Sequence, residues 1–280
     1  MLQRAQISLN RIAYPNIDLK EFLALAHELD LRMVELRNDL PGGGIIDDME
    51  PEEVLELAAR FELSIVTINA LQKFNLLDHL PAALRELEVL LDLAVAIRCP
   101  AIVLCPLNDS ADTRDAQQRY EETVRCLQAF QPMFADTSLM GYVEPLGFSE
   151  SSLSSLISAQ TAIRESGASC YRIVYDTFHH FIGPESAEQL GTKLDIGLIG
   201  LIHASGVTAD LPRSQYRDEH RGFITPEDRF ENLEQIESLL KRGFSGTVSL
   251  EPFSTLVQKL SKVQFKTEME RSLDHLIGGL

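Results

Sequence analysis

Short apolar runs alternate along this chain with longer segments in which apolar residues recur at the spacing of a helix. The short runs contain many β-branched residues and end at polar side chains, a pattern that is typical of strands buried in a parallel sheet. The pattern predicts strands at residues 5–9, 32–37, 63–69, 101–105, 139–143, 172–176, 196–202 and 247–250.

The longer segments predict the helices that connect these strands. Asp18 lies three residues before Glu21, which is typical of a helix N-cap, and Pro51 suits the first turn of the next helix. Pro100 marks the end of another helix, because proline cannot continue one. The predicted helices are 19–29, 51–61, 80–97, 111–134, 152–166, 184–190, 231–241 and 256–276.

This alternation of strands and helices over 280 residues predicts an α/β fold, the (β/α)8 TIM barrel, as a single domain over residues 1–280. A doubly wound sheet also alternates strands and helices, but it normally carries a G-x-G-x-x-G turn after an early strand. Gly42-Gly-Gly44 lacks that spacing, and we interpret it as a loop. Residues 204–228 predict a second, longer loop, and loops of that length are usually functional.

The chain is acidic. It carries 42 Asp and Glu residues against 25 Lys and Arg, a formal net charge of −17 that repels phosphate backbones and anionic lipids. We therefore expect neither a nucleic acid nor a membrane as a partner. No apolar stretch approaches the roughly 20 residues that span a bilayer, and the first residues carry no secretion signal. These observations predict a cytoplasmic protein.

The four cysteines all lie in apolar segments. They are Cys99, Cys105, Cys126 and Cys170. No two of them form a C-x-x-C pair, so the sequence predicts neither a zinc knuckle nor a disulfide framework. We expect reduced and mostly buried thiols.

Polar side chains stand at the predicted C-terminal ends of six strands, which meet at one mouth of a barrel. They are Glu35, Asn69, Glu144, Asp176, His203 and Glu251. Any one of them alone is usually just the point where a strand reaches the surface. The last four, however, end consecutive strands, and three buried carboxylates would repel one another without a cation. Three carboxylates and one imidazole suit Mn²⁺, Mg²⁺, Co²⁺ or Zn²⁺.

Five segments at the strand ends follow one another in a characteristic order. They are Ile68-Asn69-Ala70-Leu71, Val143-Glu144, Asp176-Thr-Phe-His179, Ile202-His203 and Gly243-Phe-Ser-Gly-Thr-Val-Ser-Leu-Glu251. In this order they resemble the segments of the xylose isomerase-like barrels, and within that superfamily those of the inosose (2-keto-myo-inositol) isomerases. The similarity extends over nearly the whole chain.

The resemblance implies that Glu144, Asp176, His203 and Glu251 bind one divalent metal ion. It also implies that Glu144 and Glu251 face each other across the metal and act as base and acid. They would move a proton next to a carbonyl, while the metal stabilises the enediolate. The resemblance also implies that His179, which matches the Asp-x-x-His position of the family, holds a substrate oxygen beside the metal.

Three further residues are candidates for the same site. Arg221 lies in a loop that resembles the acidic, arginine-bearing loop of the inosose isomerases, and it would bind substrate hydroxyls or support the metal ligands. Glu35 and Asn69 fit either substrate contact or support of the ligands. In an alternative interpretation, Glu35 pairs with Arg37 or with Arg221.

Several functions remain open on the sequence. A metal-dependent isomerase of an inosose or another ketosugar differs from a ketose 3-epimerase only in where the proton returns. An apurinic-site endonuclease of the same superfamily needs more histidines and a basic surface, and a non-catalytic sugar-binding barrel does not need the ligand set. Residues 224–229 replace the Pro-Gly-x-Gly turn that is usual in the inosose isomerases. We expect a small polyol or ketosugar as substrate and, because barrels of this family often associate, a homo-oligomer.

Overall fold

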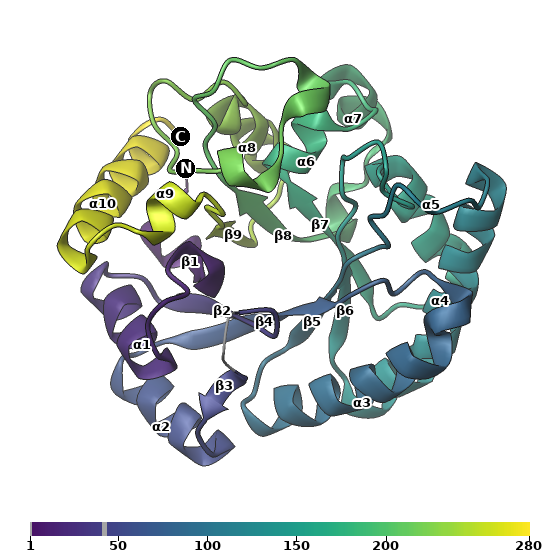
Figure 1. Cartoon of the computed structure of the whole chain (residues 1–280), viewed down its shortest axis with the longest axis horizontal. Helices are drawn as coiled ribbons and strands as arrows, with labels where there is room; N and C mark the ends of the chain where they lie inside the picture. The colour runs from purple at the N-terminus through teal and green to yellow at the C-terminus, as the bar shows by residue number, and fades with distance from the viewer. Residues whose placement is uncertain (1, 41–43) are drawn as a thin grey trace.

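The computed structural model of the chain describes residues 2–40 and 44–280, which form a closed barrel of parallel strands (Figure 1). Around the barrel the strands are β1 (Ile7–Asn10), β2 (Met33–Arg37), β4 (Ser64–Leu71), β5 (Ala101–Leu104), β6 (Met140–Val143), β7 (Tyr171–Asp176), β8 (Ile199–Ala204) and β9 (Thr247–Leu250). Strand β9 pairs with β1 and closes the barrel. The predicted (β/α)8 fold is confirmed.

Helices form a ring around the outside of the barrel (Figure 1). They are α1 (Leu19–Glu28), α2 (Pro51–Arg60), α3 (Leu80–Ala96), α4 (Ala116–Thr137), α5 (Leu156–Ser166), α6 (Thr177–Ile182), α7 (Ala187–Lys193), α8 (Asn232–Lys241), α9 (Thr255–Gln258) and α10 (Lys262–Gly278). Parallel neighbours need such crossover connections. In the described part of the chain, no helix has both the length and the apolar character to cross a membrane.

The strands are buried on both faces, which explains their continuous apolar runs. Small and medium side chains fill the interior of the barrel, namely those of Ala70, Val103, Cys105, Val174 and Leu201. The larger core lies between the strands and the outer helices. Because the interior is packed, polar side chains at the C-terminal strand ends lie at the mouth.

The cysteines are free, as the sequence predicts. Cys99, Cys105 and Cys126 are buried, and Cys170 is partly buried. Burial raises the pKa of the Cys99 and Cys126 thiols to about 12, which keeps them protonated and unreactive.

One strand was not predicted. β3 (Ile45–Asp48) lies outside the barrel order and follows the glycine loop, of which Gly42 and Gly43 lie outside the described residues. Nη2 of Arg11 donates to Oδ1 of Asp47 over 2.8 Å. This ion pair fixes β3 against the segment that follows β1.

Helix α4 begins at Ala116 and not near Ala111. The carboxylate of Asp109 accepts the backbone N–H of Ala111 at 2.8 Å, and such local bonds compete with a helix. Asp115 then forms the N-cap. The predicted helix start was therefore wrong by about one turn.

The chain after Asp176 was expected to begin a loop, but it forms the short helix α6. The carboxylate of Asp176 caps this helix by accepting the N–H groups of Phe178 and His179. A strand that ends in an N-cap passes directly into a helix, and this turn holds Asp176 at the mouth.

The loop at residues 204–228 contains more structure than the sequence predicts. It includes two 3-10 turns, η5 (Arg213–Gln215) and η6 (Asp218–His220). Gly206 and Gly222 exchange backbone hydrogen bonds of 3.0 and 2.7 Å. A Cβ at Gly206 would lie 2.0 Å from a backbone oxygen of the loop, so this contact requires glycine.

Candidate metal centre and active site

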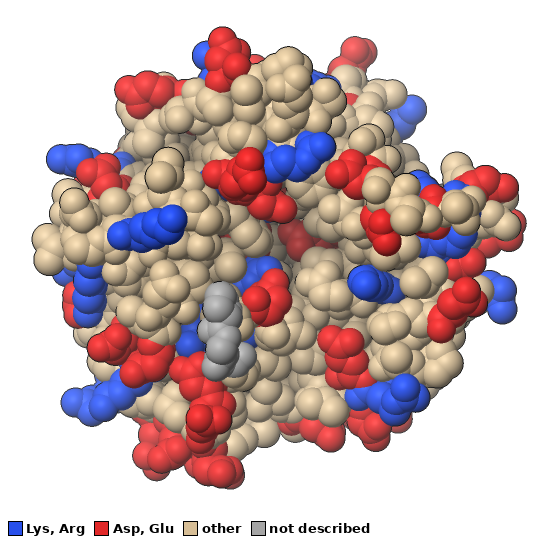
Figure 2. Space-filling view, viewed as in Figure 1, with Lys and Arg blue, Asp and Glu red and all other residues tan. Residues whose placement is uncertain are grey.

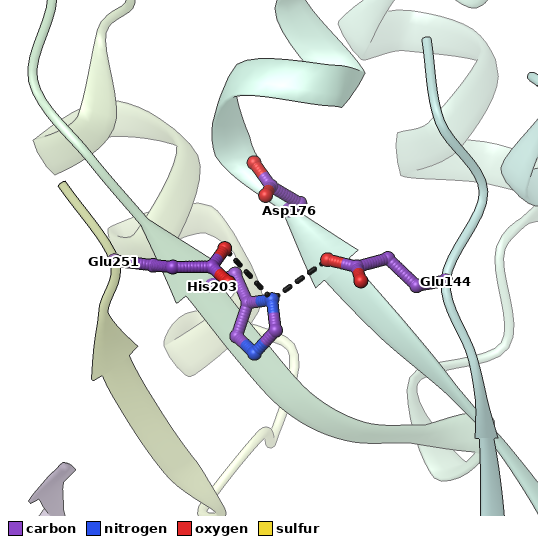
Figure 3. A group of neighbouring side chains, drawn as sticks. All are labelled: Glu144, Asp176, His203 and Glu251. Atoms are coloured by element: carbon purple, nitrogen blue, oxygen red, sulfur yellow. Dashed lines mark hydrogen bonds and ion pairs between the residues drawn. The ribbon is translucent and has the colours of Figure 1, made fainter. Parts of the chain in front are cut away.

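Four side chains from consecutive strands converge at the mouth of the barrel (Figure 3). Glu144 follows β6, Asp176 ends β7, His203 lies near the end of β8, and Glu251 follows β9. One potential ligand atom of each lies within 4.8 Å of those of the others, and all four residues are buried. The molecular face in Figure 2 has a recess near its centre in which acidic atoms are visible.

The imidazole of His203 lies at the centre of the group. Its Nδ1 is 2.7 Å from Oε1 of Glu144 and 3.2 Å from Oε2 of Glu251 (Figure 3), and its Nε2 is 3.1 Å from Oε2 of Glu35. Burial disfavours the imidazolium, but the carboxylates of Glu251, Glu35 and Glu144 outweigh it and raise the pKa of His203 well above its usual range. This imidazole is therefore a basic group in an anionic surrounding.

The two oxygens of Asp176 have different partners. Oδ1 accepts the N–H of Phe178 at 2.7 Å and that of His179 at 3.2 Å, which caps α6. Oδ2 lies 2.7 Å from Nη2 of Arg221, on the side of the other acids. One oxygen thus fixes the side chain, while the other faces the site.

Glu251 lies between two guanidinium groups. Nη1 of Arg37 donates to Oε1 at 2.7 Å, and Nη2 of Arg221 donates to Oε2 at 2.8 Å. Burial opposes the charged carboxylate, but His203, Arg221 and Arg37 together hold the pKa of Glu251 well below its usual range. Arg37 also forms an ion pair with the more exposed Asp39.

Glu144 contacts neither guanidinium. The thiol of Cys105 donates to Oε2 of Glu144 over 3.4 Å, and the other oxygen faces His203. Burial, followed by the charge of Glu144, raises the pKa of the Cys105 thiol well above its usual range. The two glutamates therefore differ in their partners, although they reach the same imidazole.

Arg221 is almost fully buried, with 1% of its surface exposed. Its guanidinium lies over the ring of Phe253 at 4.6 Å and over that of Phe178 at 5.0 Å. It also donates to the hydroxyl of Ser205 at 3.0 Å and to Asp218 at 3.1 Å. The sequence placed Arg221 at this site, and the structure brings it against two of the proposed metal ligands.

Glu35 lies behind the imidazole and not on the open side of the site, since it is 0% exposed. Its Oε2 accepts hydrogen bonds from Thr67 and, at 3.0 Å, from Asn69, and its Oε1 accepts one from Asn10 at 3.2 Å. Glu35 pairs with neither Arg37 nor Arg221, so that alternative was wrong. The location of Glu35 and Asn69 favours support of His203 over contact with a substrate.

The two neighbouring histidines have different surroundings. His179 is buried beside Asp176, and its ring packs edge-on against Phe148 with 5.1 Å between the centroids. Its Nδ1 has no hydrogen-bond partner in the described part of the chain. His180 faces outward, between the barrel and the helices α7 and α8, where burial lowers its pKa to about 4.

Arg37 and Asn10 were not among the residues predicted for the site. Both contact Glu251, and Nδ2 of Asn10 lies 3.1 Å from its Oε1. A signal was available for Arg37, because alternate residues of a strand share a face and Arg37 follows Glu35 by two positions.

The buried charges of the site fit a divalent cation. The carboxylates are Glu35, Glu144, Asp176 and Glu251, and the guanidiniums are Arg37 and Arg221, all of them buried. A cation that binds His203 displaces the proton of its imidazole, and the four anions and two cations then leave a formal charge of −2. Uncompensated buried charge is costly, and one divalent ion balances it. Carboxylate oxygens with one imidazole are ligands that such ions accept.

The chain belongs to the xylose isomerase-like TIM barrel family, whose sequence model matches residues 23–277. A xylose isomerase domain-containing protein from Salmonella typhimurium LT2 has a similar structure, with a TM-score of 0.92, 35% sequence identity and coverage of 99% of both chains. No curated protein sequence matches the chain.

More distant structures share the fold. The IolI protein, solved with a bound zinc atom, has a TM-score of 0.88 at 19% identity over 98% of both chains. The D-psicose 3-epimerase of Clostridium cellulolyticum H10, solved with D-tagatose, has a TM-score of 0.74 at 18% identity, over 98% of this chain and 99% of that one. At these identities the likeness extends to the fold alone.

Proposed function

We propose that this protein is a divalent-metal-dependent isomerase of a small ketosugar or inosose, which moves a proton next to a carbonyl. The observation that carries the proposal is the placement of Glu144 and Glu251, which approach the imidazole of His203 from opposite sides (Figure 3). A carbon acid between two carboxylates can lose a proton to one and regain it from the other.

Glu144, Asp176, His203 and Glu251 would hold the metal. Bound there, a divalent cation such as Mn²⁺, Mg²⁺, Co²⁺ or Zn²⁺ supplies the positive charge that stabilises an enediolate at the substrate carbonyl. The zinc atom of the IolI structure supports this choice of cofactor.

The proton moves between this chain's own groups and the substrate. One glutamate takes the proton from the carbon next to the carbonyl, and the electron pair of that C–H bond forms the enediolate. Return of a proton to the former carbonyl carbon, with loss of the hydroxyl proton, completes an isomerisation. Glu144 and Glu251 are 4% and 2% exposed, so bulk water is kept from the reacting carbon during the transfer, and the glutamates exchange their protons with solvent between turnovers.

The surrounding side chains would orient the substrate and the ligands. His179, whose Nδ1 has no partner in the described part of the chain, would hold a substrate oxygen. Arg221 would exchange part of its contact with Asp176 and Glu251 for substrate hydroxyls. Glu35, held by Asn69, would keep the imidazole of His203 oriented, as carboxylates behind metal-bound histidines do.

A ketose 3-epimerase is the second candidate. The folds of D-psicose 3-epimerase and of L-ribulose 3-epimerase, at TM-scores of 0.74 and 0.76, support it. This reaction uses the same first proton transfer and returns the proton to the opposite face of the same carbon.

The test is hydrogen exchange in D₂O. Purified protein supplied with Mn²⁺ is incubated with a panel of inososes and ketosugars, and NMR follows exchange at the carbons next to the carbonyl. We expect exchange with at least one compound and its loss, by a factor of about 100 or more, in Glu144→Gln and in Glu251→Gln. Glu62→Gln, at an exposed position far from the mouth, serves as the matched control.

The products distinguish the two candidates, because an isomerase moves the carbonyl whereas an epimerase inverts one carbon. Exchange that persists unchanged in both glutamate variants, or no exchange with any compound, contradicts the proposed proton transfer.

A further inference from the structure

A second cavity, of about 450 Å³, lies between the segment after β6, the end of α6 and the turn η5. Pockets that bind small molecules typically have volumes of about 300–1,000 Å³. The ring of Phe148 lines this cavity and packs edge-on against His179, with 5.1 Å between the centroids. The cavity therefore adjoins the candidate metal centre, although none of the four proposed ligands lines it.

Two arginines, Arg213 and Arg217, line the cavity, and no Asp or Glu does. In residues 2–40 and 44–280, neither arginine forms an ion pair with a carboxylate. Arg229, directly after the loop at residues 204–228, does form one, with Asp210 at 2.6 Å. Two guanidiniums without a carboxylate partner are unexpected in a chain with a net charge of −17, and they make this cavity locally positive.

Both arginines are exposed, and each guanidinium lies over an aromatic ring. Arg213 lies over the ring of Phe181 at 5.1 Å, and Arg217 lies over that of Phe148 at 5.8 Å. Nη1 of Arg217 also donates to the carbonyl oxygens of Ser214 at 2.8 Å and Tyr216 at 2.7 Å. Each guanidinium has five N–H donors, so most remain available to a ligand.

We propose that this cavity binds a phosphate group, either free or carried by a small sugar. A guanidinium presents paired donors that match phosphate oxygens, and two of them can address different edges of one tetrahedral group. Ser154 and Ser214 line the same cavity, and their hydroxyls are further, uncharged donors for such a ligand. The hydroxyl of Ser149 already donates to Glu150 at 2.9 Å, so it is not available to a ligand. This site does not rest on the proposed isomerase activity.

The test is isothermal titration calorimetry with inorganic phosphate and, separately, with ribose 5-phosphate. The ionic strength is held constant because salt screens exposed charges. We expect binding of one phosphate group per chain, with the affinity reduced about tenfold or more in Arg213→Ala and in Arg217→Ala. Arg213→Lys should retain part of the affinity. Arg85→Ala, at an exposed position on α3, should bind as the wild type does.

Tighter binding of ribose 5-phosphate than of phosphate assigns the cavity to a phosphorylated sugar, and equal binding assigns it to the phosphate group alone. Either result supports the proposal, provided that thermal unfolding shows the arginine variants to be folded. Absence of binding by both compounds overturns it. Equal affinity in wild type and in the Arg213→Ala/Arg217→Ala double variant also overturns it, because phosphate would then bind elsewhere.

Discussion

Nη2 of Arg221 lies 2.7 Å from Oδ2 of Asp176, and the same nitrogen lies 2.8 Å from Oε2 of Glu251. One guanidinium thus joins the ends of β7 and β9 and offsets the repulsion between two buried acids. Removing one partner of a buried ion pair leaves the other charge uncompensated.

We therefore expect Arg221→Ala to lower the free energy of unfolding of the metal-free protein by about 3–5 kcal/mol. Urea unfolding followed by circular dichroism measures the change. The control is Arg229→Ala, which removes an ion pair between largely exposed side chains and should cost about 1 kcal/mol or less. Equal losses in the two variants would show that Arg221 does not neutralise the site.

The carboxylate of Glu35 lies behind the imidazole of His203, with 3.1 Å between Oε2 and Nε2. Glu35→Gln keeps the size of the side chain but removes the charge that orients the imidazole. We expect this change to weaken Mn²⁺ binding by about 10–100-fold, as measured by calorimetry. If Glu35→Gln binds Mn²⁺ as tightly as Glu62→Gln does, Glu35 has no supporting role.

Gly147 packs directly against α6. A Cβ at this position would lie 2.0 Å from the backbone oxygen of His179, so Gly147→Ala must shift α6 and the segment of Gly147 apart. We expect a loss of about 1–3 kcal/mol in the free energy of unfolding. The matched control is Gly191→Ala in α7, where a Cβ meets no atom within 4 Å. That change should stabilise the protein by about 0.5–1 kcal/mol, because alanine favours a helix.

Thermal unfolding of both glycine variants gives the comparison. A neutral Gly147→Ala variant would mean that the contact between Gly147 and α6 relaxes without cost.

His180 predicts a dependence of stability on pH. Burial, and then the charge of Arg213, lowers its pKa to about 4 from a usual value of 6.5. As the pH falls, His180 is therefore protonated in the unfolded chain before it is protonated in the folded protein. The stability that the neutral imidazole contributes above pH 6.5 is lost as the pH falls from 6.5 to 4. The loss amounts to about 3 kcal/mol at most.

His180→Gln should remove this part of the pH dependence. The measurement is the difference between the unfolding free energies of wild type and His180→Gln across this pH range. A difference that does not change with pH contradicts the assignment.

The sequence predicts the barrel well, because each buried parallel strand is a continuous apolar run that ends at a polar side chain. It misses α6, since Asp176 serves both as a strand end and as an N-cap, and only the three-dimensional turn distinguishes the two. It misses β3, whose ion pair joins Asp47 to Arg11 across 36 positions.

The residues of the site that lie at strand ends were predicted from the sequence. Glu144, Asp176, His203 and Glu251 end consecutive strands, and barrel geometry alone brings such residues together. The contact of Arg37 with Glu251 joins residues 214 positions apart, and no local pattern contains that information. The burial of Glu35 likewise depends on Asn10, Thr67 and Asn69, which come from two other strands.

The stoichiometry and affinity of Mn²⁺ binding, measured by calorimetry on chelator-treated protein, test the metal centre directly. We predict one Mn²⁺ per chain in the wild type and an affinity at least about 100-fold lower in Asp176→Asn and in His203→Gln. Glu62→Gln should bind as the wild type does. Absence of binding by the wild type, or equal binding by all four proteins, would contradict the assignment of a metal centre to the barrel mouth.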